Sequence, residues 1–427
     1  MLFYNGDGCP DFVKAKHVDP SLGPGYDYDV CNSEIILTRL AVKEGRIVLP
    51  DGMNYRLLVL PKSTTMPVEV LAKLKDLVAA GMTLVGSKPQ RAPGLTDYPR
   101  CDAQVKSMAD ELWGDCDGSK VKEHAFGKGR VVCGKTVREV LTASGVTPDF
   151  SHSGAQPDAF LDWIHRSVGE TDIYFIVNRK NRAETAACTF RVRGKQPELW
   201  DAVTGTQRDA VSFSQGDSGT TVPLELPPNG SQFVVFRRAI AADAAGKAEG
   251  NYPRLTPALD LTGPWTVTFD KAWGGPGQVE FPELVDWTKR PEDGIRYYSG
   301  KATYVKSFTL TEAQVTGKSG LSLDLGDLNS LAEVRLNGKS LGIFWTKPYW
   351  VALGDAVKAG ANSLEIDIVN LWPNRLIGDG ALAPDKRLTR TNIDKYYKGE
   401  HKLLPSGLLG PVAIQSTEVA SKHDNPK

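Results

Sequence analysis

The spacing of apolar residues changes along this chain near residue 147, and that spacing limits which folds are open to it. Before this point strand-like and helix-like patterns alternate, and residues 57–60 form an apolar run that suits a parallel strand covered on both faces. From residue 160 to 238 apolar residues recur at every second position, with turn clusters between them. The sequence therefore predicts a multidomain α/β plus all-β protein, in which an α/β layer precedes antiparallel β-sandwiches.

A βαβ unit is predicted within the first layer. Pro67 fits the first turn of a helix, and Leu71 and Leu74 belong to one apolar stripe. Gly81 supplies the end of this helix before a strand at residues 83–85. The unit places the run at 57–60 in the centre of a parallel sheet.

A tight hairpin is predicted near the other end of the chain. The pair Asn337-Gly338 favours the left-handed backbone of a two-residue type I′ turn. Residues 364–369 alternate apolar residues with Glu365 and Asp367, so one face of this strand should be buried and the other wet. Both features predict an antiparallel sheet.

Composition excludes some classes of function. The 427 residues suggest about three domains. Lys plus Arg, 51, equals Asp plus Glu, 51, so no strong positive field favours nucleic acid. The longest apolar runs have the length of strands, so no membrane span is expected. The start, MLFYNGDGCP, shows no secretory signal, and localisation stays open.

The cysteines show no metal-binding spacing. None of the six forms a C-x-x-C pair, so no zinc site is predicted and no metal is assigned. We expect small buried hydrophobes of a reduced protein rather than disulfides. The six are Cys9, Cys31, Cys101, Cys116, Cys133 and Cys188.

A cluster late in the chain has the side chains that sugars need. Sugars offer flat C–H faces to aromatic rings and hydroxyl groups to Asp, Asn and Arg. The candidate substrate-binding residues here are Trp345, Tyr349, Trp350, Trp372, Asn374, Arg375 and Asp379. In the alternative interpretation these tryptophans fill a core, and Arg375 and Asp379 form a buried ion pair that ties a loop to a sheet.

A second polar and aromatic segment, PGYDYDVCNSE, contains the candidate residues Asp27, Asp29 and Asn32. In the structural alternative Asn32 caps a helix over residues 34–42 and the aspartates lie near its positive end. General acid–base catalysis by carboxylates needs them positioned around one bond, and the sequence offers no way to pair them. The catalytic residues therefore stay unknown.

Two segments with histidine are expected to be structural. The stretch SHSGAQ at residues 151–156 lies near a predicted domain boundary and is expected to be an exposed linker. His165 alternates with apolar neighbours on a predicted strand, which favours a structural histidine over a catalytic one.

Several segments together resemble a known family. NLWPNRLIGD is the most specific, and RPEDGIRYYSGKATYVKSF, QPELWDAVTG, GETDIYFIVNR, GYDYDVCNSEIILTRL and DGMNYRLLVLP extend the similarity over nearly the whole chain. They resemble the α-L-rhamnosidases of glycoside hydrolase family 106 and, more loosely, the sugar-binding domain of family 2. The resemblance implies a full-length enzyme, often periplasmic or secreted, that cleaves terminal α-L-rhamnosyl bonds with inversion and calcium.

The same resemblance implies a catalytic (β/α)8 barrel ahead of these modules. Such a barrel needs about 250 residues, and the present chain has no room for it. We therefore expect the C-terminal accessory portion of such an enzyme, not catalytically complete alone, with a rhamnose-containing oligosaccharide or polysaccharide as partner. A free-standing carbohydrate-binding protein and a scaffold for a separately encoded barrel are the alternatives. In the functional interpretation of the segment around Asp27, this loop leans over the sugar site of the missing barrel.

The expected domain boundaries follow from these patterns. They are a flavodoxin-like or amidotransferase-like α/β domain at 1–147, a β-sandwich at 148–240, an Ala-rich linker at 241–252, a galactose-binding-like jelly-roll at 253–418 and a tail at 419–427.

Overall fold

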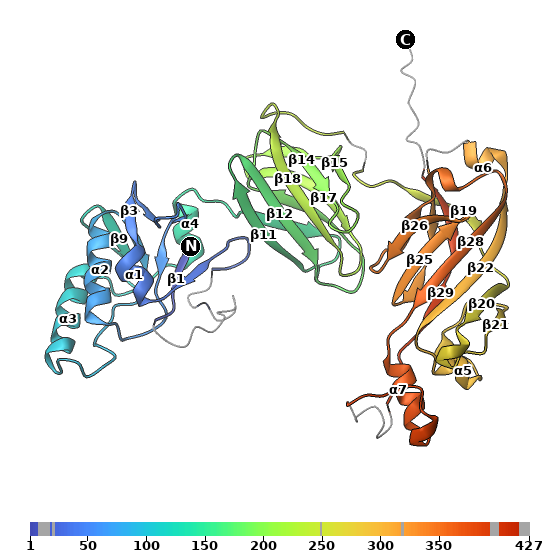
Figure 1. Cartoon of the computed structure of the whole chain (residues 1–427). Coiled ribbons are helices and arrows are strands. Elements are labelled where there is room, and N and C mark those ends of the chain that lie inside the picture. The colour runs from blue at the N-terminus through green and yellow to red at the C-terminus, as the bar shows by residue number, and fades with distance from the viewer. Residues whose placement is uncertain (7–17, 19–21, 248–249, 317–319, 393–400, 418–427) are drawn as a thin grey trace, which may run out of the picture. The chain divides into compact units, whose positions relative to one another are not determined.

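The computed structural model describes residues 1–6, 18, 22–247, 250–316, 320–392 and 401–417 (Figure 1). Contacts divide the chain into two compact units. The first is Met1–Ile176 with Thr185–Leu224 and Gln232–Ala248, and the second is Val177–Glu184 with Glu225–Ser231 and Glu249–Lys427. The predicted tail at 419–427 and Cys9 lie outside the described residues.

A six-stranded, mainly parallel sheet forms the core of the N-terminal layer. Its strand order is β2-β1-β6-β7-β9-β8, and only β8, at one edge, runs antiparallel to its neighbour. The strands are β2 (Asp29–Cys31), β1 (Leu2–Tyr4), β6 (Leu58–Val59), β7 (Thr83–Val85), β9 (Gly129–Val132) and β8 (Glu123–Phe126). The helices are α1 (Ser33–Arg39), α2 (Val68–Ala79), α3 (Arg100–Trp113) and α4 (Val137–Ala143) (Figure 1).

The predicted βαβ unit is confirmed as β6, α2 and β7. Leu71 and Leu74 of α2 are fully buried, because the apolar stripe of the helix packs on the sheet. Gly81 ends this segment with a φ of +127°, a conformation that residues with a Cβ rarely adopt. The run at 57–60 is buried throughout, as expected for a central parallel strand.

The helix predicted at 34–42 is shorter than expected. It ends at Arg39, because Leu40 takes an extended backbone and residues from Ala41 onward pair in a small antiparallel sheet instead. That sheet contains β3 (Ala41–Lys43), β4 (Arg46–Val48) and β5 (Asn54–Tyr55).

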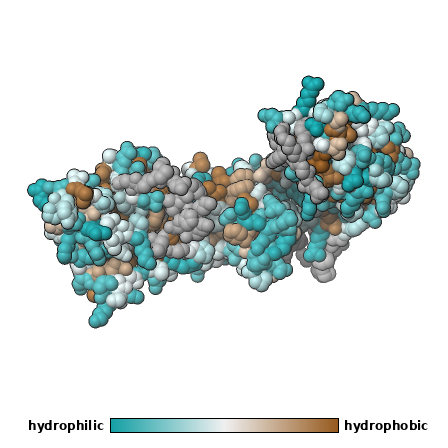
Figure 2. Space-filling view, turned by 90° about the horizontal axis from the view of Figure 1, so that it is seen from below, coloured by the Kyte–Doolittle hydropathy of each residue, from teal (hydrophilic) through white to brown (hydrophobic). Residues whose placement is uncertain are grey.

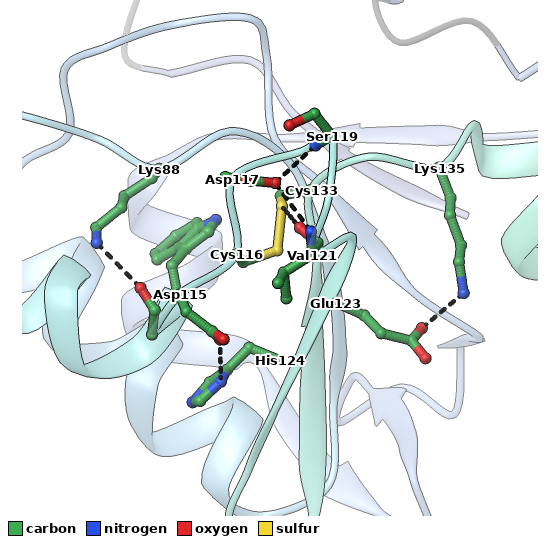
Figure 3. Close-up of a disulfide and its surroundings, with 12 residues drawn as sticks. Lys88, Asp115, Cys116, Asp117, Ser119, Val121, Glu123, His124, Cys133 and Lys135 are labelled. Carbon is green, nitrogen blue, oxygen red and sulfur yellow. Dashed lines mark hydrogen bonds and ion pairs between the residues drawn. A yellow bond between two sulfur atoms is a disulfide. The ribbon is translucent and has the colours of Figure 1, made fainter.

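The prediction of reduced cysteines is wrong for one pair. Cys116, after α3, forms a disulfide with Cys133, after β9, and so joins a helix end to a strand end (Figure 3). Asp117 shapes the loop between them, since its Oδ1 accepts the backbone N–H groups of Ser119 and Val121. The separation of 17 residues carries no local signal for pairing. The thiols of Cys31, Cys101 and Cys188 are free and buried, as predicted.

Two antiparallel sheets follow and face one another. One holds β10 (Phe150–Gly154), β13 (Glu184–Phe190), β17 (Gly219–Leu226) and β16 (Ser214–Gly216) in that order. The other holds β11 (Leu161–Val168), β12 (Thr171–Asn178), β18 (Ser231–Ala239), β14 (Lys195–Trp200) and β15 (Gln207–Asp209). Aromatic rings join their inner faces, with Tyr174 and Phe190 4.8 Å apart between centroids.

The segment predicted as an exposed linker is a strand of this sandwich. Residues 151–154 belong to β10, and His152 lies opposite Cys188 of β13. The alternation of small polar residues hid the strand, because their backbone groups rather than their side chains hold it in the sheet.

The second unit holds a four-stranded and a six-stranded antiparallel sheet. The first contains β19 (Leu255–Asp260), β30 (Ala413–Thr417), β23 (Leu321–Asp324) and β27 (Trp350–Ala352). The second contains β21 (Gln278–Phe281), β20 (Trp265–Phe269), β22 (Lys301–Leu310), β28 (Gly360–Val369), β25 (Leu331–Leu336) and β26 (Lys339–Phe344). Short elements complete it: β24 (Asp327–Asn329), β29 (Gly407–Gly410), α5 (Asp293–Arg296), α6 (Glu312–Thr316) and α7 (Pro373–Gly380). Residues from both large sheets form one core.

The hairpin at Asn337-Gly338 is confirmed. Both residues have positive φ, +52° and +80°, between the paired strands β25 and β26. The prediction that one face of β28 is exposed to solvent is wrong at Asp367, which is buried. Arg335 and Thr303 bind its carboxylate, and this compensates for its loss of water.

The coarse fold prediction, an α/β layer with antiparallel β-sandwiches, is confirmed. Within the described ranges, no helix has the length and apolar character needed to cross a membrane. On the face shown in Figure 2, hydrophobic side chains lie in small groups among hydrophilic ones.

Candidate functional site

Helix α7 carries three of the predicted sugar-binding residues, Asn374, Arg375 and Asp379, and Trp372 is its N-cap residue. Pro373 opens it, and its fixed φ suits the first helical position. The Ser299 hydroxyl accepts the backbone N–H of Arg375, which also donates to the carbonyl of Trp372, and itself donates to the carbonyl of Leu371. Asn374 is buried and exchanges hydrogen bonds of 2.7 and 2.8 Å with the backbone of Leu404.

Arg375 and Asp379 form a buried ion pair one helical turn apart. Arg375 Nε lies 3.0 Å from Asp379 Oδ1, although the angle between the groups does not meet hydrogen-bond geometry. Gly378 makes room for this arrangement, because a Cβ there would come within 2.7 Å of the Arg375 guanidinium and 2.6 Å of Tyr297. Arg375 and Asp379 therefore have the geometry of the buried ion pair that the sequence offered as the alternative to sugar binding.

The second oxygen of Asp379 holds a segment that we call the strap, residues 382–391. Both the backbone N–H and the hydroxyl of Thr389 donate to Asp379 Oδ2, at 2.7 and 2.6 Å. Arg387 Nε donates to the main-chain oxygen of Asp379 at 3.1 Å. Charge-assisted hydrogen bonds to a buried carboxylate are among the stronger ones in proteins, so Asp379 ties the strap to α7.

The strap, α7 and Trp273 line an open pocket of about 440 Å³, which we call the α7 pocket. The rings of Trp273 and Trp372 meet in it edge to face, with centroids 5.7 Å apart. Its lining consists of Trp273, Trp372, Leu376, Leu388, Thr389, Arg390 and Thr391. The pocket thus combines indole rings, aliphatic surface, threonines and one cation.

The structure separates the predicted residues of this unit into three groups. Trp372 lines the α7 pocket, whereas Asn374, Arg375 and Asp379 are buried behind it and hold its walls. Tyr349 is buried in the core of the unit. The remaining pair, Trp345 and Trp350, is exposed at 63% and 50%, and neither lines the α7 pocket. Their role in binding stays a prediction.

Sequence reasoning missed Trp273, Leu388 and Arg390. Trp273 lies on a short 3-10 helix, Lys271–Trp273, nearly a hundred positions before Trp372, so no local pattern joins the two rings. A weak signal was present at Asp270, which caps that helix by accepting the N–H of Ala272. The strap has no regular alternation, so its residues could not be assigned to a site.

The candidate residues of the first unit have structural partners. Asn32 caps α1 by accepting the N–H of Ile35, as the structural alternative states. Asp29 accepts a hydrogen bond of 2.9 Å from the hydroxyl of Tyr55. Burial and this bond raise the pKa of Tyr55. Asp27 accepts the N–H of the adjacent Tyr28. Ligand contact by these residues stays a prediction.

In the sandwich, Asp149, His165 and Ser167 are in contact in the same order as the acid, histidine and serine of a catalytic triad. His165 Nδ1 lies 2.8 Å from Asp149 Oδ2, and its Nε2 lies 3.4 Å from the hydroxyl of Ser167. A second carboxylate, Asp172, lies 3.2 Å from the same Nε2. Burial alone would lower the pKa of His165, but the hydrogen bonds and charges of Asp149 and Asp172 outweigh it and raise the pKa to about 9.

A protonated imidazole cannot accept a proton from Ser167, so the raised pKa of His165 disfavours a nucleophilic role for this group at neutral pH. Cations balance its carboxylates, since Arg191 binds Asp149 and Lys195 binds Asp172, each at 2.9 Å. The Tyr174 ring stacks on the imidazole at 4.0 Å. The geometry fits the structural interpretation of His165.

No group of three or more His, Cys, Asp or Glu residues is placed to hold a metal ion within the ranges that the structure describes. A calcium ion, which the family resemblance raised, therefore has no assigned ligands here.

Comparisons with known proteins agree with this architecture. A family model described as alpha-L-rhamnosidase matches residues 1–215. A solved rhamnosidase from Novosphingobium sp. PP1Y is 35% identical with a TM-score of 0.81, and the match covers 91% of this chain and 36% of that one. A Formosa agariphila protein with the provisional name beta-glucuronidase is 25% identical over 97% of this chain and 55% of that protein. This chain thus spans about half of one relative and about a third of the other.

The fold and these matches define the class of the protein as a glycoside hydrolase relative. The chain belongs to glycoside hydrolase family 106, the α-L-rhamnosidases.

The His165 network predicts a loss of stability at alkaline pH. The pKa is raised from 6.5 to about 9, so the contribution is fully present below about pH 6.5 and is lost as pH rises through 9. The complete loss amounts to roughly 3 kcal/mol at most. Urea unfolding from about pH 6 to about pH 10 should show this slope, and His165→Gln should flatten it. An unchanged slope in the variant would contradict the assignment.

The Arg375–Asp379 pair predicts a large effect of a single substitution. Arg375→Ala should lower the free energy of unfolding by about 3–5 kcal/mol, because Asp379 remains buried without its cation. The matched control is Lys339→Ala, which removes an exposed pair with Asp355 and should cost less than about 1 kcal/mol. Equal losses of unfolding free energy in the two variants, measured by urea unfolding, would show that burial gives the Arg375–Asp379 pair no larger role in stability than an exposed pair has.

Proposed function

We propose that this chain is the glycan-contacting accessory portion of an α-L-rhamnosidase-like glycoside hydrolase, and that the α7 pocket makes the contact. The observation that carries the proposal is the pair Trp273 and Trp372, whose rings meet in a cavity of about 440 Å³ in a chain of this family. Indole rings supply faces for sugar C–H groups, and neighbouring threonines and an arginine supply polar contacts.

We also infer the finer fold types and the domain boundaries stated from the sequence. The order β2-β1-β6-β7-β9 supports a flavodoxin-like or amidotransferase-like type for the α/β layer at 1–147. The two facing antiparallel sheets with one common core support a galactose-binding-like jelly-roll for residues 253–418. The sandwich at 148–240 and the linker at 241–252 complete this division.

The lining of the α7 pocket supports a rhamnose-containing ligand. L-rhamnose is a 6-deoxy sugar, so it carries a methyl group that would pack on Leu376 and Leu388. Its hydroxyl groups would take the polar contacts of Thr389 and Arg390. The catalytic chemistry would belong to a (β/α)8 barrel, either in the same protein or supplied in trans.

A second candidate ligand follows from the charge of Arg390. A guanidinium binds a carboxylate well, so a glucuronic acid residue would suit the same pocket. One relative carries the provisional name beta-glucuronidase, which supports this alternative.

Binding measurements test the site. We expect Trp372→Ala and Trp273→Ala each to weaken binding of a rhamnose-containing oligosaccharide about fivefold, because each ring contributes about 1 kcal/mol. Trp345→Ala is the matched control, as it removes an exposed ring outside the α7 pocket. Titration calorimetry with the oligosaccharide and with a glucuronide measures both ligands. If only Trp345→Ala weakened binding, the α7 pocket would not be the site, and the sugar would bind at Trp345 and Trp350 instead.

The chain alone is not expected to hydrolyse aryl α-L-rhamnosides. Among the described residues, none of the sheets is a closed barrel of eight parallel strands, and two positioned carboxylates supply most of the rate in glycosidases. The assay should be run with and without calcium, with a barrel-containing family member as positive control. Turnover that one carboxylate substitution abolishes without unfolding the chain would refute the accessory role.

A further inference from the structure

A second cavity lies in the α/β layer, at the carboxyl ends of its parallel strands. Its volume is about 330 Å³, and we call it the sheet-edge pocket. Residues that end β1 line one side and residues that follow β6 line the other. β1 and β6 are parallel neighbours, with Leu2 paired to Leu58 and Phe3 to Val59, so the pocket opens between two adjacent core strands.

The chain changes direction in the sheet at this point. From β1 it moves to β2 on one side, and it then crosses to β6 on the opposite side of β1 before continuing to β7 and β9. At such a reversal the connections after two neighbouring strands leave in opposite directions, which opens a crevice at their carboxyl ends. Open parallel sheets bind their ligands in that crevice. The position of the sheet-edge pocket is therefore the one that the topology favours.

The lining of the pocket is uncharged and mixes polar with apolar residues. It consists of Tyr4, Asn5, Gly6, Leu60, Pro61, Ser63, Thr65, Met66, Pro67, Ser87 and Pro93. The hydroxyls of Ser63 and Thr65 lie 3.2 Å apart, and the hydroxyl of Tyr4 bonds to Ser33. Within the described part of the chain, the side chains of Asn5 and Ser87 make no hydrogen bond, so their polar groups are available to a ligand.

The same lining disfavours a phosphate or nucleotide. No Lys or Arg belongs to it, and Pro61 and Pro67 have no N–H group to offer an anion. Glu69 places a negative charge in the first turn of α2, whose N-terminus adjoins the pocket. An anion would meet repulsion there instead of the usual attraction of a helix start.

We propose that the sheet-edge pocket binds an uncharged polyhydroxy ligand of the size of a monosaccharide. Ser87, Asn5 and the hydroxyls of Ser63 and Thr65 provide the hydrogen bonds, and Leu60 and Met66 provide apolar contact. The volume lies at the small end of ligand pockets, which fits one sugar ring and not an oligosaccharide. The choice of a sugar rests on the proposed glycan function, whereas the location rests on the sheet alone.

The test uses the full chain with binding at the α7 pocket weakened by Trp372→Ala. Methyl α-L-rhamnoside is the probe, and saturation-transfer NMR detects its binding. Adding Asn5→Leu and Ser87→Leu fills the sheet-edge pocket with aliphatic groups and removes its available polar groups. The matched control is Ser107→Leu on the exposed face of α3. Circular dichroism verifies that each variant is folded.

We expect residual binding in the Trp372→Ala chain, its loss by at least about tenfold with the two leucines, and no change with Ser107→Leu. Loss of all binding in Trp372→Ala alone would refute the sheet-edge site and leave the α7 site intact. Binding that Trp372→Ala leaves unchanged and the leucines abolish would refute the α7 site and support this one. Displacement of the sugar by inorganic phosphate would show an anion site and overturn the proposed ligand class.

Discussion

The buried carboxylate of Asp379 is the group on which the candidate glycan site depends. One of its oxygens faces Arg375 and the other accepts two hydrogen bonds from Thr389, so a single side chain joins α7 to the strap. Arg375 and Thr389, the two partners of Asp379, are both buried, so loss of either partner would leave a buried polar group without compensation and would lower stability. The indole of Trp372 and the side chains of the strap can face one another because this link holds their backbones in place.

Other charged residues of the chain have the same kind of role. Asp367 is buried among Arg335, Lys301 and Thr303, and Asp149 is held by His165 and Arg191. Each of these carboxylates is paired with cations or hydroxyls of neighbouring strands, so it strengthens a sheet instead of facing a substrate bond. The sugar contacts proposed here come from aromatic rings, neutral polar groups and the guanidinium of Arg390, none of which is a carboxylate, and this suits recognition better than acid–base chemistry.

Much of the fold could be predicted because its signals are local. The Asn337-Gly338 turn, the buried run around β6 and the Asn32 cap each depend on residues within a few positions of one another. The errors have a common cause in contacts distant along the chain. The disulfide between Cys116 and Cys133, the burial of Asp367 and the meeting of Trp273 with Trp372 are set by tertiary packing, for which one sequence gives no pattern. Of the site, therefore, only Trp372 and the residues that support it were found beforehand.

The most direct test of the central claim is a crystal structure of this chain soaked with a rhamnose-containing oligosaccharide. The account predicts electron density for a sugar ring against Trp273 and Trp372, with its hydroxyls within hydrogen-bonding distance of the strap. Sugar density against Trp345 and Trp350, with the α7 pocket free of ligand, would contradict it.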